Sequence, residues 1–190
     1  LLDFAKIEAG KMKVNIQNHS ISTLVSFCIS NVKSAANSNG IGVYFEDNSE
    51  GLVVQVDQGL MEKAIFNLLS NAMKFNRPGG KITVSLEKGD EQFVIKVKDD
   101  GIGIPGKDLE RIFDRFNQVD SSPSINQGGT GIGLSLTKEI VDLHHGNISV
   151  SSELGKGAEF VIRIPIQAPQ NAQPSGDGID NVQVEDDSLD

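Results

Sequence analysis

Three polar side chains share one face of a predicted helix and could together hold a metal–phosphate group. Asn67, Asn71 and Lys74 lie in the segment EKAIFNLLSNAMKF at positions i, i+4 and i+7, a spacing that brings them to one side of an α-helix. Amide oxygens ligate hard cations such as Mg²⁺, and a lysine ammonium meets phosphate charge. A solvated polar stripe would have the same pattern, so the helix alone does not decide between the two interpretations.

Three glycine-rich segments could supply the backbone contacts that a nucleotide needs. They are DDGIGI (99–104), GGTGIGL (128–134) and GKGAEF (155–160). The second opens a predicted helix, where backbone N–H groups form a ready anion site. A carboxylate such as Asp99 is a poor phosphate partner but a good acceptor for an exocyclic amine, such as that of adenine. Each segment alone could be a turn, but all three together with the polar helix favour a nucleotide site.

The segment DDGIGIPG (99–106) also matches the dinucleotide-binding fingerprint G-x-G-x-x-G, but its surroundings oppose that interpretation. The first strand of a doubly wound sheet is apolar on both faces, whereas Lys96 and Lys98 alternate with apolar residues here. Asp120, at the distance expected for a ribose-binding acid, follows a predicted helix rather than a second strand. Two carboxylates precede the first glycine, where a pyrophosphate should approach bare backbone. A Walker A loop fails as well, because Leu134 stands where that motif needs lysine.

Length and composition indicate one globular domain with appended segments. Hydrophobic residues make up 38% of the 190 residues and charged residues 23%, and no apolar run of about 18 residues could span a membrane. The net charge of −9 is concentrated in residues 168–190, which hold six carboxylates and no Lys or Arg, leaving −3 for the remainder. We therefore expect no nucleic-acid surface and no membrane contact. The single cysteine, Cys28, lies on the apolar phase of a helix, so we expect a buried, inert thiol in a cytoplasmic setting.

Periodicity along the chain predicts an α/β two-layer sandwich with a mixed, mostly antiparallel sheet covered on one face by helices. The predicted elements before the first glycine box are a strand at residues 14–16, a helix capped by Ser20 or Ser22, strands at 41–45 and 52–56, an amphipathic helix over 58–75 and a hairpin over 81–99. The later ones are a short helix with Leu109, Ile112, Phe113 and Phe116 on its apolar face, a helix from Gly131 to His144, and strands NISVSS and EFVIRIP.

Five motifs, in order, resemble the catalytic and ATP-binding domain of sensor histidine kinases, whose superfamily includes DNA gyrase, a heat-shock chaperone and mismatch-repair ATPases. NLLSNAMKF resembles the N box, DDGIGI the first glycine box, IFDRF the F box, GGTGIGL the second glycine box and GKGAEF the last one. The resemblance covers about residues 14–166. It implies the Bergerat-type ATP-binding fold of that superfamily.

The resemblance implies ATP and Mg²⁺ as ligands and a role for each matching residue. Asn71 would ligate Mg²⁺, while Asn67 and Lys74, nearest to the chemistry, would contact phosphate directly or through the metal. Asp99 would accept the adenine amino group. The other nucleotide contacts would come from Phe75, Gly101, Gly103, Ile104, Gly129, Thr130, Gly131, Gly133 and Leu134, and Phe113 and Phe116 would anchor the lid over the phosphates.

The neutral amide of Asn67 favours a kinase over a hydrolase. The superfamily's ATPases carry a glutamate one turn before the metal-binding asparagine, and an amide cannot activate water as a general base. An ATPase and a nucleotide-free pseudokinase remain as alternatives. Ala158 stands where many members have a Ser or Thr that supports the adenine-binding Asp. Gln118 stands where many have a phosphate-binding Arg, which leaves Arg115 or Gln118 as candidates for the γ-phosphate contact.

The resemblance also implies domain boundaries and partners. Residues 1–12 would end the second helix of a dimerisation and histidine-phosphotransfer domain, 13–167 would be the catalytic domain, and 168–190 an acidic flexible linker or tail. The phosphoacceptor histidine would lie in the missing part, because His19, His144 and His145 are not followed by an acidic residue; we expect these three in loops or at helix ends. The full-length protein would be a homodimer and a membrane-anchored kinase, this chain its cytoplasmic portion, with a response-regulator receiver domain as partner.

Overall fold

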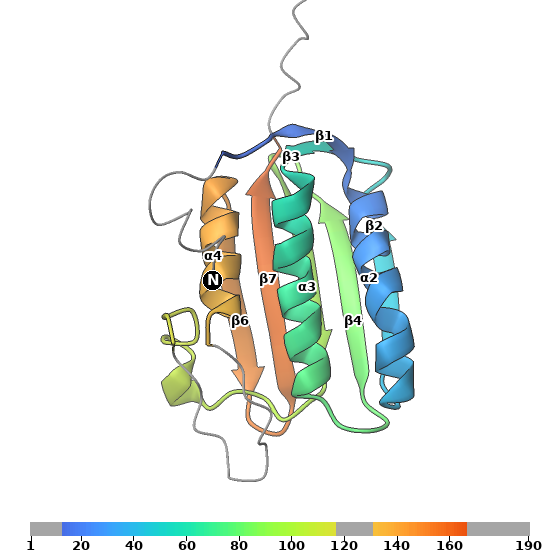
Figure 1. Cartoon of the computed structure of the whole chain (residues 1–190), viewed down its shortest axis with the longest axis vertical. Coiled ribbons are helices and arrows are strands. Elements are labelled where there is room, and N and C mark those ends of the chain that lie inside the picture. Colours follow the sequence, from blue (N-terminus) through green and yellow to red (C-terminus); the bar gives the residue numbers. More distant parts are fainter. Residues whose placement is uncertain (1–12, 117–130, 167–190) are drawn as a thin grey trace, which may run out of the picture.

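The computed structural model describes residues 13–116 and 131–166. In that part of the chain, helices lie on one face of a five-stranded sheet of order β2-β4-β5-β7-β6 (Figure 1). The helices are α2 (Ile21–Ser38), α3 (Gln58–Lys74) and α4 (Gly133–Leu143). The strands of the sheet are β2 (Gly42–Asn48), β4 (Lys81–Lys88), β5 (Gln92–Asp99), β6 (Asn147–Glu153) and β7 (Gly157–Pro165), while β1 (Gln17–Ser20) and β3 (Val53–Val56) form a separate antiparallel pair.

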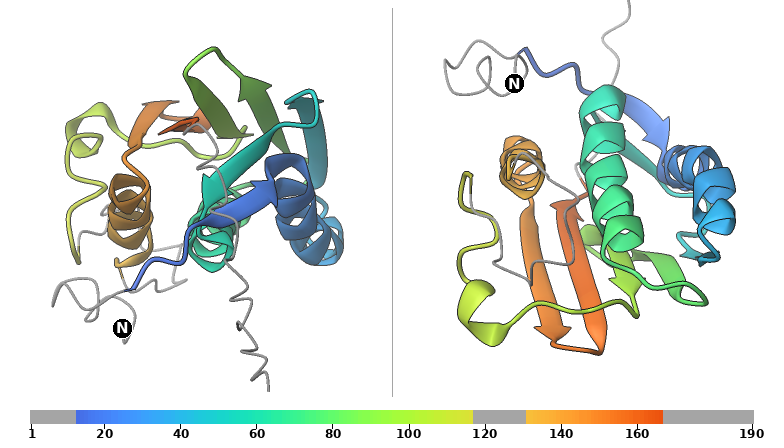
Figure 2. Two further views of the ribbon diagram at one scale, coloured as in Figure 1. Left: turned by 90° about the horizontal axis from the view of Figure 1, so that it is seen from above. Right: turned by 60° about the horizontal axis from the view of Figure 1, so that its bottom comes forward.

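The sheet is mixed and mostly antiparallel, which confirms the predicted fold class. Only the pair β2–β4 is parallel among the four pairings within the sheet. The strands alternate, so that Ile82, Val84 and Leu86 are fully buried under the helices while the residues between them are polar and face outward. A view from above shows the helical layer on one side of the sheet (Figure 2, left).

The central helix α3 owes its position to a continuous apolar face. Seven of its residues are buried, and Ile65, Leu68 and Leu69 are fully so. Asp57 caps its first turn by accepting a hydrogen bond from the Leu60 N–H at 3.0 Å. The polar residues of α3 are therefore left on the remaining face, where the proposed site chemistry lies.

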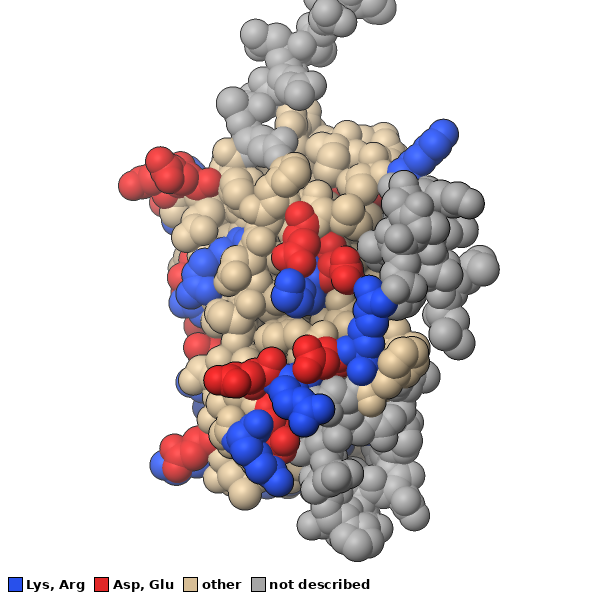
Figure 3. All heavy atoms as spheres, turned by 90° about the vertical axis from the view of Figure 1, so that its left-hand side faces the viewer, with Lys and Arg blue, Asp and Glu red and all other residues tan. Residues whose placement is uncertain are grey.

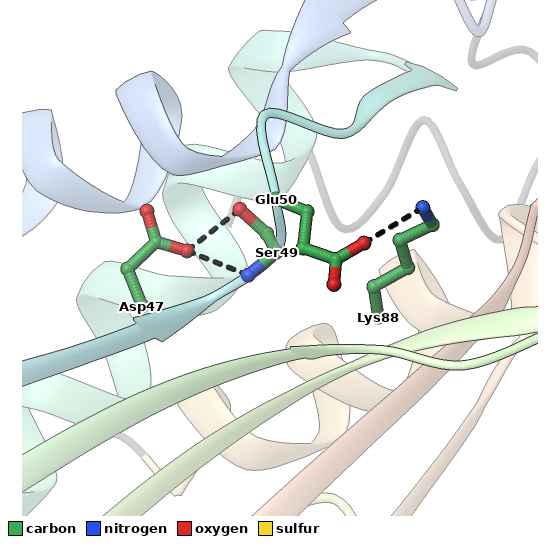
Figure 4. A network of polar contacts seen from close by, with 4 residues as sticks. All are labelled: Asp47, Ser49, Glu50 and Lys88. Atoms are coloured by element: carbon green, nitrogen blue, oxygen red, sulfur yellow. Dashed lines mark hydrogen bonds and ion pairs between the residues drawn. The ribbon is translucent and has the colours of Figure 1, made fainter.

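Polar contacts hold the turn between β2 and β3 (Figure 4). Asp47 Oδ1 accepts from the Ser49 backbone N–H at 2.9 Å and from the Ser49 hydroxyl at 2.6 Å, and Ser22 of α2 donates to Oδ2. The hydrogen bond from Ser22, followed by those from Ser49, holds the pKa of Asp47 below its usual value. Lys88 at the end of β4 pairs with Glu50 at 3.2 Å. The turn is thereby tied to both layers of the sandwich.

The sequence-based expectations for two segments are wrong. The first strand spans Gln17–Ser20 rather than residues 14–16, because its partner is β3, with Gln17 opposite Val56. His19 consequently lies in a strand, opposite Val54, and not in a loop. Periodicity in so short a segment cannot fix which residues pair with a strand over thirty positions away.

The segment after the first glycine box does not form the predicted helix. It contains a 3-10 turn at Gly106–Asp108 and further isolated turns rather than a helix to Phe116. Ile112 is buried, but Phe116 is 69% exposed and has a left-handed φ of 58°, which a helix does not accommodate. The expectations for residues 1–12 and 168–190 lie outside the described residues.

The single cysteine of the chain lies in the core of the domain. Cys28 is fully buried, and burial raises its pKa to about 12; the prediction that this thiol is buried is confirmed. Within residues 13–116 and 131–166, no helix has the length and apolar character needed to cross a bilayer.

A buried histidine joins the end of α4 to the start of α3. His144 follows α4, is 3% exposed, and its Nε2 accepts the backbone N–H of Asp57 at 2.9 Å. Its Nδ1 lies 2.8 Å from the Ile140 carbonyl, so Nδ1 carries the proton and the ring is neutral. Burial lowers the pKa of His144, and the charge of His145 acts in the same direction, while the Ile140 carbonyl and Asp57 oppose the shift. Protonation of Nε2 would break the bond to Asp57.

We predict that the free energy of unfolding falls as the pH drops below the unfolded-state histidine pKa of 6.5. The folded state binds this proton less readily than the unfolded state, so the contribution is present above pH 6.5 and lost as the pH falls through the lowered folded-state value. Urea unfolding of the wild type and His144→Gln between neutral pH and about pH 5 measures it. The fall in the free energy of unfolding with decreasing pH should be smaller in His144→Gln and unchanged in His145→Gln. An equal fall in the wild type and His144→Gln would contradict the role of His144.

Candidate nucleotide-binding site

The predicted site residues that the structure describes, with the last glycine box, lie towards one end of the molecule. They come from the end of α3, the end of β5 with the loop after it, the start of α4, and the turn between β6 and β7. Figure 2 (right) turns this end forward. Backbone hydrogen bonds join the segments: Ile102 N–H donates to the Phe75 carbonyl at 3.0 Å, and Gly155 N–H donates to the Ile102 carbonyl at 2.7 Å.

Asp99 is a buried carboxylate at the end of the central strand β5. It is 7% exposed, and its Oδ1 accepts the Gly101 N–H at 2.9 Å. Burial raises the pKa of Asp99, the N–H groups of Gly101 and Ala158 oppose that shift, and the charge of Asp100 adds to it. A carboxylate fixed in this way can accept a hydrogen bond from an amine but would repel phosphate.

The loop after Asp99 is packed too tightly for side chains at its glycines. A Cβ at Gly101 would lie 2.2 Å from the Phe75 carbonyl oxygen, and one at Gly103 would lie 2.1 Å from that of Glu153. Gly103 also has a φ of 71°, which favours glycine. The loop therefore lies between the end of α3 and the β6–β7 turn, with backbone at its surface. Ile104, which ends this box, is half-buried against the core.

The polar face of α3 meets the start of α4. The Nδ2 of Asn67 donates to the Gly133 carbonyl at 3.2 Å and lies 3.4 Å from Thr137 Oγ1. With its NH₂ directed to α4, Asn67 keeps its carbonyl oxygen as the atom that can accept or ligate. Asn71 is half-buried one turn later. The Nζ of Lys74 lies 4.9 Å from the centroid of the Phe75 ring, which holds the ammonium at the end of the helix.

The second glycine box is described in part. Gly129, Thr130 and Gln118 lie outside the described residues. Gly131 has a φ of 66°, and its carbonyl accepts the Phe116 N–H at 3.0 Å. Ile132 precedes α4 and supplies no side-chain acceptor for the N–H groups of the first turn, which begins at Gly133. The half-buried Leu134 packs against the core. A helix start of this kind can receive an anion.

The F box connects the site to the sheet and to α4. Phe113 packs edge-on against Phe160 of β7, with the ring centroids 6.4 Å apart. Arg115 pairs with Glu139 of α4 at 3.6 Å. The ring of Phe116 is exposed, and any apolar contact with residues 117–130 lies outside the described residues. Arg115, a candidate for the γ-phosphate contact, is thus engaged with a carboxylate in this structure.

Charges on the surface around the site are mixed in sign. On the α4 side, Lys and Arg lie next to Asp and Glu (Figure 3), and Lys138 pairs with Asp142 at 2.8 Å.

A hollow of about 410 Å³ lies on the outer, polar face of the sheet, with Asp99 and Asp100 among its lining residues. Other lining residues are paired, as Lys96 is with Glu87 at 2.6 Å. Because this hollow lies across the sheet from α3, we do not assign the phosphates to it.

Two residues that the sequence reasoning did not single out support the first glycine box. The Ser152 hydroxyl of β6 accepts the Ile104 N–H at 2.8 Å and donates to the Gly157 carbonyl at 2.6 Å. Gly157 has a φ of 87° and packs directly on the Asp99 backbone. A signal for Ser152 was present: Ile148 and Val150 occupy the inward phase of β6, and Ser152 continues that phase with a polar side chain just before a glycine turn.

Comparisons with known proteins identify the family of this domain. The sequence profile of the histidine kinase-, DNA gyrase B-, and HSP90-like ATPases matches residues 56–168. The circadian input-output histidine kinase CikA of Synechococcus elongatus is 34% identical over 94% of this chain and 24% of its own length. Hybrid signal transduction histidine kinase D of Dictyostelium discoideum is 38% identical over 87% of this chain and 11% of its own. The chain thus spans a quarter or less of these relatives.

Solved structures show the same likeness in three dimensions. The catalytic domain of histidine kinase ThkA superimposes with a TM-score of 0.71 at 25% identity, covering 80% of this chain and 98% of that domain. Full-length ShkA in complex with AMPPNP gives 0.78 at 25% identity, over 88% of this chain and 35% of ShkA. The predicted resemblance is confirmed: the chain belongs to the histidine kinase-, DNA gyrase B- and HSP90-like ATPase family and is an ATP-binding catalytic domain of the sensor histidine kinase type.

Proposed function

We propose that this domain binds Mg²⁺–ATP and transfers the γ-phosphoryl group to a histidine on the dimerisation domain of a longer two-component kinase. The observation that carries the proposal is the buried Asp99 carboxylate, held by the Gly101 N–H at 2.9 Å beside a loop whose glycines admit no side chain. This is the environment that an adenine amino group requires. The polar face of α3 lies at the same end of the molecule.

Asp99 would give the site its preference for adenine. The 6-amino group of adenine donates a hydrogen bond to the carboxylate, whereas the 6-oxo group of guanine or hypoxanthine would meet it oxygen to oxygen. A buried acceptor without a donor loses free energy. Phe75 and Ile104 would flank the base, and the backbone at Gly101 and Gly103 would approach it closely.

The phosphates would lie between α3 and the start of α4. The amide oxygen of Asn71 would hold Mg²⁺, which supplies charge neutralisation for the phosphates. Lys74 and the carbonyl oxygen of Asn67 would contact phosphate or the metal's water ligands. Gly129, Thr130, Gly131, Gly133 and Leu134 would contribute from the lid and the first turn of α4.

The domain would preserve ATP until an acceptor arrives. Asn67, whose NH₂ group is bonded to α4, offers no basic group to activate water. Phosphoryl transfer would then depend on positioning of the acceptor imidazole and on charge stabilisation. An ATPase of the same superfamily is the competing candidate, and Asn67 is the observation against it.

The remaining proposals concern the longer protein. A structure of ThkA in complex with the response regulator TrrA, and a hybrid kinase among the relatives, support a receiver domain as the later phosphoryl acceptor. Residues 1–12 would join this domain to the dimerisation helices of a homodimer on the cytoplasmic side of a membrane, and residues 168–190 would be a linker.

We expect Asp99→Ala to weaken ATP binding about 10- to 100-fold, because one buried hydrogen bond to a charged acceptor is lost. Asn71→Ala should lower the affinity only when Mg²⁺ is present. Titration of the chain with ATP, with and without Mg²⁺, measures both effects. Ser70→Ala, on the exposed side of α3, is the matched control and should bind as the wild type does. Unchanged Mg²⁺–ATP affinity in both site variants would refute the proposed site.

We expect the isolated chain to bind ATP without hydrolysing it continuously. Phosphate release over several hours should not exceed that of Asp99→Ala, whose site is impaired. Steady release by the wild type that Asn71→Ala abolishes would instead identify an ATPase.

In the longer protein, label from [γ-³²P]ATP should appear on a histidine. Phosphohistidine is recognised because acid releases the label while alkali does not. Asn71→Ala in the same protein should abolish labelling, and label that resists acid would place the phosphoryl group on a hydroxyl side chain and contradict the proposal.

A further inference from the structure

We propose that Ser152 is a positioning residue for adenine recognition: its hydroxyl joins the two backbone segments that lie directly against Asp99. This inference rests on the proposed function, because it assigns the support of the same site. Ser152 itself contacts no nucleotide in this proposal. Its effect on the choice between bases is exerted through Asp99.

The hydroxyl of Ser152 is used in both directions. It accepts the Ile104 N–H at 2.8 Å and donates to the Gly157 carbonyl at 2.6 Å. Ile104 belongs to the loop after β5, and Gly157 begins β7. One side chain from β6 therefore fixes the distance between two segments that are over fifty residues apart in the sequence. An alanine at this position could make neither bond.

Each of these two segments lies directly against Asp99. Gly101 is in the loop that Ser152 holds through Ile104, and its N–H donates to Asp99 Oδ1 at 2.9 Å. Ala158 follows Gly157, and its N–H lowers the pKa of Asp99. Gly157 lies so close that a Cβ there would be 2.0 Å from the Asp99 carbonyl oxygen. A shift of either segment would therefore move a donor away from the carboxylate or press on its backbone.

The residue at 158 makes this support necessary. Ala158 has no hydroxyl with which to hold Asp99, so the support comes from backbone groups, whose position depends on their own segments. Ser152 lies opposite Ala158 in the β6–β7 register. Its hydroxyl therefore lies on the neighbouring strand, opposite the position where many family members have a Ser or Thr. It binds the backbone of the two segments that lie against Asp99.

The test compares ATP with ITP, which differ at the group that Asp99 would read. The wild-type chain should bind ATP more tightly than ITP. Ser152→Ala should weaken ATP binding by about fivefold, the value of one ordinary hydrogen bond, and leave ITP binding nearly unchanged. Ser152→Thr keeps the hydroxyl and should restore the preference. Ser151→Ala, the neighbouring exposed serine of β6, is the control and should behave as the wild type.

A purely structural role would give a different result. In that case Ser152→Ala would weaken ATP and ITP equally, which would overturn the inference. In an Asp99→Ala background, Ser152→Ala should have no further effect on the ATP/ITP ratio; a further loss would also overturn it. If circular dichroism shows that Ser152→Ala is unfolded, Ser152→Cys, whose thiol is a weak donor and acceptor, replaces it.

The outcome separates this inference from the proposed function. An ATP preference that depends on Asp99 but is the same in wild type, Ser152→Ala and Ser152→Cys would refute the role of Ser152 alone. Absence of Asp99-dependent ATP binding in the wild type would refute both.

Discussion

The buried carboxylate of Asp99 constrains the whole nucleotide end of this domain. A carboxylate in the interior is unfavourable unless donors surround it, and β5, the middle strand of the sheet, carries it to a position covered on both sides. The Gly101 N–H donates to this carboxylate at 2.9 Å, and the nearby Ala158 N–H lowers its pKa. To bring backbone this close, the loop after β5 and the β6–β7 turn must pack against each other and against the end of α3, which leaves no room for side chains at Gly101, Gly103 and Gly157. The glycine boxes follow from the carboxylate's need for donors.

The two faces of helix α3 have different roles, one in the core and one in the proposed site. Its apolar face is the centre of the core, while Asn67, Asn71 and Lys74 occupy the other side. The pair α3–α4 is held at both ends: Asn67 bonds to Gly133 at the site, and Asp57 bonds to His144 at the opposite end. Because α4 starts at the second glycine box, the same contacts that stabilise the helical layer also set where that box begins.

Sequence reasoning reached the fold class and the family because both depend on local patterns. The hairpin of β4 and β5, the amphipathic α3 and the order of the five motifs are all readable from spacing. It misplaced the first strand, since the pairing of Gln17 with Val56 is set by tertiary structure. It predicted a helix where residues 109–116 form turns, because apolar spacing does not reveal the left-handed φ at Phe116. It missed Ser152, whose importance comes from hydrogen bonds to two distant segments and not from its neighbours in sequence.

The amide at Asn67 shows how the fold and the chemistry restrict each other. Its NH₂ group donates to the Gly133 carbonyl, and Thr137 Oγ1, 3.4 Å from the same nitrogen, itself donates to that carbonyl at 3.0 Å. A glutamate in this place would face the Gly133 carbonyl with a second oxygen and would have to turn away from α4 or separate it from α3. The side chain that cannot activate water is thus also the one that this arrangement of α3 and α4 accommodates. The packing of the helical layer and the proposed retention of ATP would thus depend on the same side chain.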